Sequence, residues 1–438
     1  MNNATSASFS YVVGTDPSSI PNVLFGSVLG FTTYNVTLSY QDAFNNPASS
    51  VTNTNIQTLA PPSISIANNT YVGLINTALT TISVTSSGGA VSSYAISPSL
   101  PTGLTLNTTT GAISGTPTAI LASTTFTLSA TNSVGTVSVT FSLLIDMDTD
   151  GDGVTNDKDA FPNDPTRAFE CYYPATNGPG TLMFEDLWPK KGDYDLNDLV
   201  AEYKVRFIYN AQNNLVEAFM TIVTKALGAG NSNGFMYQLD KITPNKILSV
   251  TGSKITGSNW VNLAANGTEI GQQKANILIF DNGNAVLPNG STSNITNAEP
   301  DKPYFTPDTT RIKITFDTRP GNTTHFSQLS FNPYLIANQK RGVEIHLPGF
   351  APSDKADRSI FGTFDDNTIL STGKYYQTSN NLPWAIDVHT TIPYMQEQKE
   401  ITTGYSKFLL WAQSNGTQFN DWYLDVSNNR VNSNLYLR

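Results

Sequence analysis

The chain has 438 residues, a length that accommodates about three domains. Hydrophobic residues make up 39% of it and charged residues only 13%, and the formal net charge is −10. The acidic balance leaves no basic stripe to neutralise phosphates, which argues against a nucleic-acid partner, and no apolar run is long enough to span a bilayer.

The remaining polar residues are mainly Ser, Thr, Asn and Gly, a composition that suits exposed β-structure and is common in exported proteins. The opening stretch MNNATSASFS has neither the basic nor the apolar region of a signal peptide. We therefore expect a processed or truncated piece of an exported protein that acts outside the cell or at its surface, with an intracellular protein as the alternative. The single cysteine, Cys171, excludes an intrachain disulfide and is interpreted as a buried small hydrophobic residue.

The first part of the chain is predicted to consist of β-strands, because short runs alternate apolar and polar residues between Ser, Thr, Gly, Pro and Asn clusters. Residues 36–52 resemble residues 126–140, and the offset of about ninety residues is close to the size of one immunoglobulin-like sandwich. We predict a partial or short Ig-like β unit at 1–60 and a complete sandwich at 61–145. An incomplete first sandwich could exchange a strand with a neighbouring chain.

Residues 94–118, YAISPSLPTGLTLNTTTGAISGTPT, contain a specific hairpin pattern. Leu104 and Leu106 share one strand face, Ile113 is a predicted core residue of the next strand, and Gly111 is free to adopt positive φ in the turn. The pattern LPxGLxLxxxTGxISGTPT resembles the "putative Ig" family of bacterial surface proteins, which is related to cadherin-like and dystroglycan-type domains. The resemblance implies a spacer or a platform for a ligand.

The segment 146–168 follows as a linker with crowded carboxylates: seven Asp lie within residues 146–165. Its D-x-D-x-D-G spacing is that of a calcium loop, in which alternate residues aim oxygen atoms inward and Gly153 permits the sharp turn. The candidate calcium ligands are Asp148, Asp150, Asp152, the carbonyl of Val154, Asn156 and Asp159.

The same segment resembles the thrombospondin type 3 calcium repeats, in the pattern DxDxDGDGVxNDxDAFPxDP. Asp146, Asp157 and Asp164 could hold a second ion or cap the turn. The alternative is a solvated acidic linker. A bound ion would neutralise the repulsion between the carboxylates and stiffen the joint between the modules.

Residues 169–438 alternate strand patterns with turns, which predicts a large antiparallel β-sandwich or jelly roll and hence an all-β protein. The stretch MFEDLWPKKGDYDLNDLVAEYKV, residues 183–205, resembles the signature of the LruC domain family of bacterial exported and lipid-anchored proteins. Further blocks of the pattern extend the resemblance over roughly 180–425. The resemblance implies an exported β-rich domain and little about mechanism.

A second calcium site is predicted within this signature. If the stretch 193–197 is extended, alternation puts Asp193, Asp195 and Asn197 on one side, and the hard oxygens fit calcium rather than zinc. Further candidate ligands are Glu185, Asp186 and Asp198, and Asp365 and Asp366 could complete the shell from across the fold. The alternatives are capping hydrogen bonds and catalysis.

No zinc-protease, serine-hydrolase or Cys/His signature is present, so we expect a non-enzymatic protein. The predicted function is a calcium-stabilised, cell-surface modular protein for adhesion or assembly of a surface structure, binding a surface protein or a glycan. The alternatives are a carbohydrate-binding module, for which Trp384 and Trp422 are the predicted surface aromatics, a self-assembling fibre subunit, and a polysaccharide hydrolase.

Overall fold

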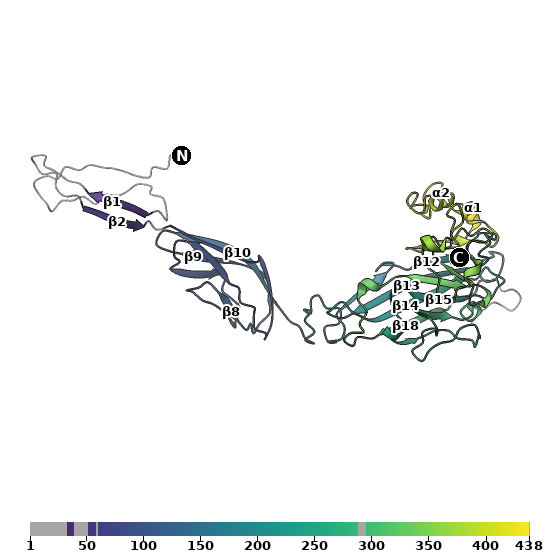
Figure 1. Cartoon of the computed structure of the whole chain (residues 1–438), viewed down its shortest axis with the longest axis horizontal. Coiled ribbons are helices and arrows are strands. Elements are labelled where there is room, and N and C mark those ends of the chain that lie inside the picture. The colour runs from purple at the N-terminus through teal and green to yellow at the C-terminus, as the bar shows by residue number, and fades with distance from the viewer. Residues whose placement is uncertain (1–32, 39–50, 58–59, 288–294, 438) are drawn as a thin grey trace, which may run out of the picture. The chain divides into compact units, whose positions relative to one another are not determined.

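A computed structural model of the protein describes residues 33–38, 51–57, 60–287 and 295–437. The chain divides into two compact units, one of residues 1–149 with 155–157 and one of residues 150–154 with 158–438. Strands dominate both units and confirm the all-β prediction (Figure 1). Most of the predicted first Ig-like unit, and with it the prediction of strand exchange, lies outside the described residues.

The secondary structure of the N-terminal unit, in the residues that the structure describes, consists of strands. Their bounds are β1 (Thr33–Leu38), β2 (Val51–Gln57), β3 (Pro62–Ile66), β4 (Thr70–Leu74), β5 (Val84–Gly88), β6 (Ser93–Ser97), β7 (Leu104–Leu106), β8 (Ile113–Gly115), β9 (Leu121–Thr131) and β10 (Thr136–Asp146). A four-stranded sheet has the order β4-β10-β9-β6, while β1 pairs with β2, β3 with β5 and β7 with β8. The second halves of β9 and β10 bury every second residue, and these side chains fill the core beneath the sheet.

The predicted hairpin at β7 and β8 is confirmed. Leu104 and Ile113 are buried in the core, and the two strands pair antiparallel. Gly111 has φ +76, and a Cβ there would lie 2.7 Å from the ring of Tyr94, so both the turn and the packing require glycine. The amide oxygen of Asn107 accepts hydrogen bonds from the backbone of Thr109 and Thr110 and closes the turn.

The C-terminal unit is a sandwich of two antiparallel sheets, as predicted. The first has the order β16-β18-β14-β13-β12-β21, with β11 pairing against β13, and the second has the order β17-β15-β19-β20. The bounds are β11 (Phe169–Tyr173), β12 (Gly180–Phe184), β13 (Leu199–Tyr209), β14 (Leu215–Ala226), β15 (Gly234–Leu239), β16 (Ile247–Thr251), β17 (Ala275–Phe280), β18 (Thr309–Phe316), β19 (Asn332–Ile336), β20 (Glu344–His346) and β21 (Ala385–Val388).

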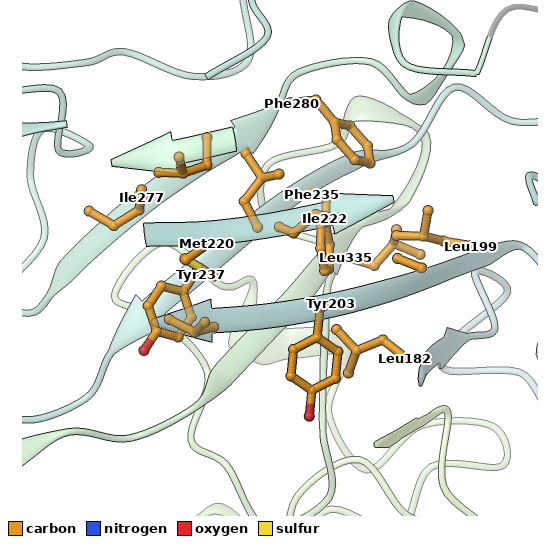
Figure 2. Close-up of a cluster of buried hydrophobic side chains, with 14 of the residues drawn as sticks. Leu182, Leu199, Tyr203, Met220, Ile222, Phe235, Tyr237, Ile277, Phe280 and Leu335 are labelled. Carbon is orange, nitrogen blue, oxygen red and sulfur yellow. The ribbon is translucent and has the colours of Figure 1, made fainter. Parts of the chain in front are cut away.

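Side chains from both sheets meet in one hydrophobic core. Tyr203 and Met220 of the first sheet lie opposite Phe235, Tyr237 and Leu335 of the second, as Figure 2 shows. Strands β13 and β14 alternate buried and half-buried residues, because one face packs on this core. The core therefore fixes the ends of β12 and β13, from which the acidic segment 185–198 projects.

A smaller hydrophobic cluster contains buried side chains of the last part of the chain. It packs around helices α1 (Ile401–Gly404) and α2 (Phe408–Gln413) and the paired strands β22 (Tyr394–Met395) and β23 (Leu435–Tyr436). Trp384 and Trp422, predicted as surface residues, are only 0% and 2% exposed, so this prediction is wrong. Turn residues flank both tryptophans but do not direct their side chains: Trp384 donates to the carbonyl of Lys190, and Trp422 packs edge-on against Tyr405.

Candidate metal centre

The acidic segment 185–198 connects two neighbouring antiparallel strands. β12 ends at Phe184 and β13 begins at Leu199, and these two residues are paired, so the segment leaves and re-enters the sheet at one place. A loop closed in this way returns its side chains to a small volume. Both Glu185, at the start, and Asp198, at the end, are buried.

The backbone of this loop is not extended, contrary to the sequence prediction. Gly192, Tyr194 and Leu196 have φ of +69, +58 and +55, so left-handed residues alternate with Asp193 and Asp195. For a residue with a Cβ this conformation costs about 1–2 kcal/mol. Burial of Tyr194 and Leu196 holds the loop in place, and the Tyr194 hydroxyl donates to the carbonyl of Pro383.

The loop nevertheless brings three predicted residues together. Carboxylate oxygens of Glu185, Asp193 and Asp195 all lie within 4.8 Å of one another. Glu185 is 0% exposed, and neither of its carboxylate oxygens has a hydrogen-bond partner among the described residues. Gly192 permits the approach, because a Cβ there would lie 2.4 Å from Oε1 of Glu185. Of these three carboxylates, only that of Asp193 belongs to an exposed residue.

Asn197 lies beside this group with one free oxygen. Its Nδ2 donates to Oδ2 of Asp195 at 2.9 Å and to the carbonyl of Met395 at 3.3 Å, while its buried Oδ1 has no partner among the described residues. Gly228 leaves the space for this amide, since a Cβ there would lie 1.6 Å from Oδ1. The two hydrogen bonds that Nδ2 donates fix the orientation of the Asn197 amide. They leave Oδ1 as a hard, neutral oxygen that points away from both bonds.

Asp186 and Asp198 lie close enough to Glu185 for their charges to interact with its carboxyl group, and they also form hydrogen bonds of their own. The backbone N–H of Asp186 donates to Oδ2 of Asp198 at 2.6 Å. Oδ2 of Asp186 accepts from the amides of Asn231 and Asn233. Asp365 and Asp366 are also bound locally: Asp365 accepts from the backbone of Lys191, and Asp366 accepts from Gly362 and Thr368.

Sequence reasoning missed one carboxylate, Glu397. It lies on the segment after β22, and its neighbour Gln398 donates a backbone hydrogen bond to Oδ2 of Asp195. Burial, and then the charges of Asp195 and Asp193, raise the pKa of Glu397 to about 8. No local pattern could have found it, because about two hundred residues separate it from the loop.

The electrostatics of the cluster are unfavourable as it stands. Burial, reinforced by the negative charges of Asp195, Asp193 and Asp186, raises the pKa of Glu185 to about 9. Burial and the charge of Asp193 raise the pKa of Asp195 to about 7, and burial also raises the pKa of Asp198. Crowded carboxylates raise one another's pKa when no cation compensates them.

No basic side chain compensates this charge within the described residues. The ion pairs formed there do not include Glu185, Asp195 or Glu397, and the nearby Lys191 pairs with Glu400 at 2.6 Å. Buried charges are ordinarily paired or bound to a metal. The residues therefore fit a hard cation, with Glu185, Asp193 and Asp195 as ligands and Asn197 and Glu397 as further oxygen donors.

The other predicted site, the acidic loop 146–159, also brings carboxylates together. Oxygens of Asp148, Asp150 and Asp152 lie within 4.8 Å of one another. Oδ1 of Asp150 accepts from the backbone of Asp152, and Oδ1 of Asp152 accepts from Val154, while their buried Oδ2 atoms have no hydrogen-bond partner in the described part of the chain. Their role as calcium ligands stays a prediction.

The remaining candidates in this segment form local hydrogen bonds. The side chain of Asn156 spans the loop to Thr149, accepting from its N–H and donating to its hydroxyl. Asp159 accepts from the backbone of Phe161. Asp146 accepts from Met147 and Asp157 from the Thr155 hydroxyl. Asp164 caps a turn by accepting from Thr166, which lowers its pKa.

Two stretches of the chain match family models. Residues 50–146 match a model described as "Putative Ig domain", in agreement with the hairpin pattern. Residues 213–423 match a model described as "Domain of unknown function (DUF4842)". No curated protein matches the chain. Neither helix of the described residues combines the length and apolar character needed to cross a membrane.

Several solved structures resemble the chain weakly. One is described as a "putative lipoprotein" from Bacteroides ovatus, with 15% identity, a TM-score of 0.46 and coverage of 94% of each chain. Another is a SusE-like surface-located polysaccharide-binding protein from Bacteroides thetaiotaomicron, with 11% identity, a TM-score of 0.17, and coverage of 67% of this chain and 61% of that one. Similarity at this level does not identify a function. The acidic segment 185–198 lies outside both of the stretches that match family models, 50–146 and 213–423.

Proposed function

We propose that the protein is a non-enzymatic modular protein of the cell exterior whose C-terminal unit is stabilised by bound calcium. One observation carries the proposal: Glu185 is fully buried beside Asp193 and Asp195, and neither of its oxygens has a hydrogen-bond partner among the described residues. A buried carboxylate without a partner costs several kcal/mol. A divalent cation between the three carboxylates would remove that cost.

The donor set favours calcium over other common cations. The candidate ligands that the described residues bring together are oxygen atoms, from carboxylates and from the amide of Asn197. Zinc sites in proteins ordinarily include nitrogen or sulfur ligands. Magnesium is ordinarily held by one or two carboxylates and keeps several waters, whereas calcium accepts six to eight oxygens with loose angular demands.

Burial of the ligands supports a structural role for the ion. Glu185 and Asp195 are 0% and 1% exposed, and only Asp193 of the three is open to solvent. A cation enclosed in this way would leave little room for a substrate, whereas catalytic metals keep an open coordination position. The absence of a hydrolase signature in the sequence supports the same conclusion.

We extend the proposal to the acidic loop 146–159 as a second calcium site. The convergence of Asp148, Asp150 and Asp152 and the resemblance to thrombospondin type 3 repeats support it. An ion there would order the segment that joins the two units of the chain. The Ig-like match, the LruC resemblance and the exported composition favour a surface role in adhesion or assembly.

The direct test is the metal content of protein purified without chelator, followed by thermal melting with added calcium and with EDTA. We expect calcium in the purified protein and a higher Tm in calcium, because a ligand that binds only the native state stabilises it. A protein without bound metal whose Tm is the same in calcium and in EDTA would refute the proposal.

A further inference from the structure

One pocket of the C-terminal unit is separate from the acidic cluster. It has a volume of about 700 Å³, within the range of ligand pockets in proteins. Strands β11 and β21, the turn 377–383 and the end of helix α2 contribute to its wall. All of these belong to one compact unit.

Aromatic side chains form part of the wall. Tyr173 and Phe331 line the pocket and contact each other, with ring centroids 4.8 Å apart. Trp411 lines the pocket as well and is half-buried. Its ring centroid lies 5.5 Å from that of Phe408 and 5.3 Å from that of Trp422. The indole is thereby held in a fixed orientation with part of its surface accessible. Rigid aromatic surfaces of this kind bind apolar ring faces at low entropic cost.

A carboxylate is fixed in the wall by two tyrosines. Oδ1 of Asp387 accepts from the Tyr203 hydroxyl at 2.6 Å, and Oδ2 accepts from Tyr173 at 3.1 Å. Tyr173 also contacts Nε2 of His389 at 2.9 Å. Nε2 of His389 also lies 3.5 Å from Oδ2 of Asp387, so the second lone pair of Oδ1 is the acceptor that remains for a ligand. The Asp387 side chain is 11% exposed, which places this capacity at the pocket surface.

A pair of amides supplies a complementary donor and acceptor. Nε2 of Gln377 donates to Oδ1 of Asn415 at 3.0 Å, which orients both groups. Oε1 of Gln377 and Nδ2 of Asn415 take no part in that bond, so one acceptor and one donor remain for a ligand. Among the described residues that line the pocket, the charged ones are Lys374 and Asp387, one of each sign. A neutral ligand is therefore favoured over a polyanion.

We propose that this pocket binds a neutral sugar ring, with Trp411 as the aromatic surface, Asp387 as acceptor for hydroxyl groups, and the Gln377–Asn415 pair as a second polar contact. A pyranose carries hydroxyl groups around its edge and C–H bonds on its faces, so it matches a fixed carboxylate, an oriented amide pair and a rigid indole. This inference goes beyond the proposed calcium-stabilised role, because the wall of the pocket contains none of the candidate calcium ligands.

The test is binding of the full chain to an array of neutral glycans, followed by titration with methyl glycosides of glucose, galactose, mannose and N-acetylglucosamine, read by tryptophan fluorescence. We expect at least one glycoside to bind. Gln377→Ala and Asn415→Ala should each weaken binding roughly three- to tenfold, the size of one or two hydrogen bonds. Gln413→Ala is the matched control, because Gln413 is exposed at the end of helix α2, two residues before Asn415, and does not line the pocket.

If Trp411→Ala does not fold, Trp411→Phe takes its place. Trp411→Phe should weaken binding and also remove the fluorescence response to the glycoside. The absence of binding on the array and in all four titrations would overturn the proposal. Binding that Gln377→Ala and Asn415→Ala leave unchanged would overturn it as well. The titrations are run in calcium and in EDTA. Sugar binding by a protein that binds no calcium would refute the calcium proposal alone, and calcium binding without sugar binding would refute the pocket alone.

Discussion

Replacing Glu185 by Gln should have opposite effects with and without calcium. The metal-free protein holds Glu185 at a pKa of about 9, against an ordinary value of 4.5. At pH 8 the unfolded chain ionises this carboxyl while the folded protein keeps it protonated. Proton uptake on folding costs about 1.4 kcal/mol for each pH unit between the ordinary pKa and the working pH, an upper bound of ~5 kcal/mol for this group.

The neighbouring carboxyls share this cost, so a stabilisation of about 2–5 kcal/mol is expected for Glu185→Gln in EDTA. That corresponds to a rise in Tm of roughly 4–10 °C. In calcium the variant loses a ligand. Wild-type protein at a calcium concentration a hundred times Kd gains about 2.7 kcal/mol, and the variant should gain little of it.

The assay is thermal melting of both proteins at pH 8 in EDTA and in calcium. Glu217→Gln is the matched control, because Glu217 is also buried but is paired with Arg167 at 2.9 Å and Lys313 at 2.6 Å. The control should be destabilised in both buffers and keep the full response to calcium. If Glu185→Gln responds to calcium as wild type does, Glu185 is not a ligand.

Three further predictions concern pH, packing and the linker. In EDTA the Tm should fall as pH rises from 5 to 9. The pKa values in the folded protein, about 7 for Asp195, about 8 for Glu397 and about 9 for Glu185, lie above those in the unfolded chain. The stability that these groups contribute is therefore present at low pH and is lost through that range. Calcium should flatten this slope, and calorimetry in buffers of different ionisation enthalpy should show protons released on binding. Gly228→Ala should weaken calcium binding about tenfold or more, because its Cβ would displace the Asn197 amide, whereas Gly230→Ala, with open space around it, should not; equal affinities would contradict the role of Asn197. Chelation should speed proteolysis within 146–168 while both flanking units stay folded, and cleavage at one rate in both buffers would count against an ion in that loop.

Short sequence patterns predict the structural features that depend on neighbouring residues. The β7–β8 hairpin followed from the spacing of Leu104, Gly111 and Ile113, and all three take the predicted places. The alternation of acidic residues also predicts the grouping of Asp193 and Asp195, but for an extended segment. Left-handed residues at Tyr194 and Leu196 produce the grouping instead, and only tertiary packing can hold such residues in that conformation.

Long-range features could not be predicted in this way. Glu397 and Gly228 reach the cluster from strands and turns far along the chain, so no spacing connects them to the loop. The tryptophans show the same limit. Trp384 and Trp422 stand among turn residues, yet each side chain fills a core, because burial depends on which elements pack over a turn and not on the turn itself.

The most direct test of the bound cation is anomalous X-ray diffraction from crystals grown in calcium. A peak bounded by carboxylate oxygens of Glu185, Asp193 and Asp195, at calcium–oxygen distances of about 2.3–2.6 Å, is the expected result. A water molecule or a lysine ammonium in that position, with no anomalous signal, would contradict it.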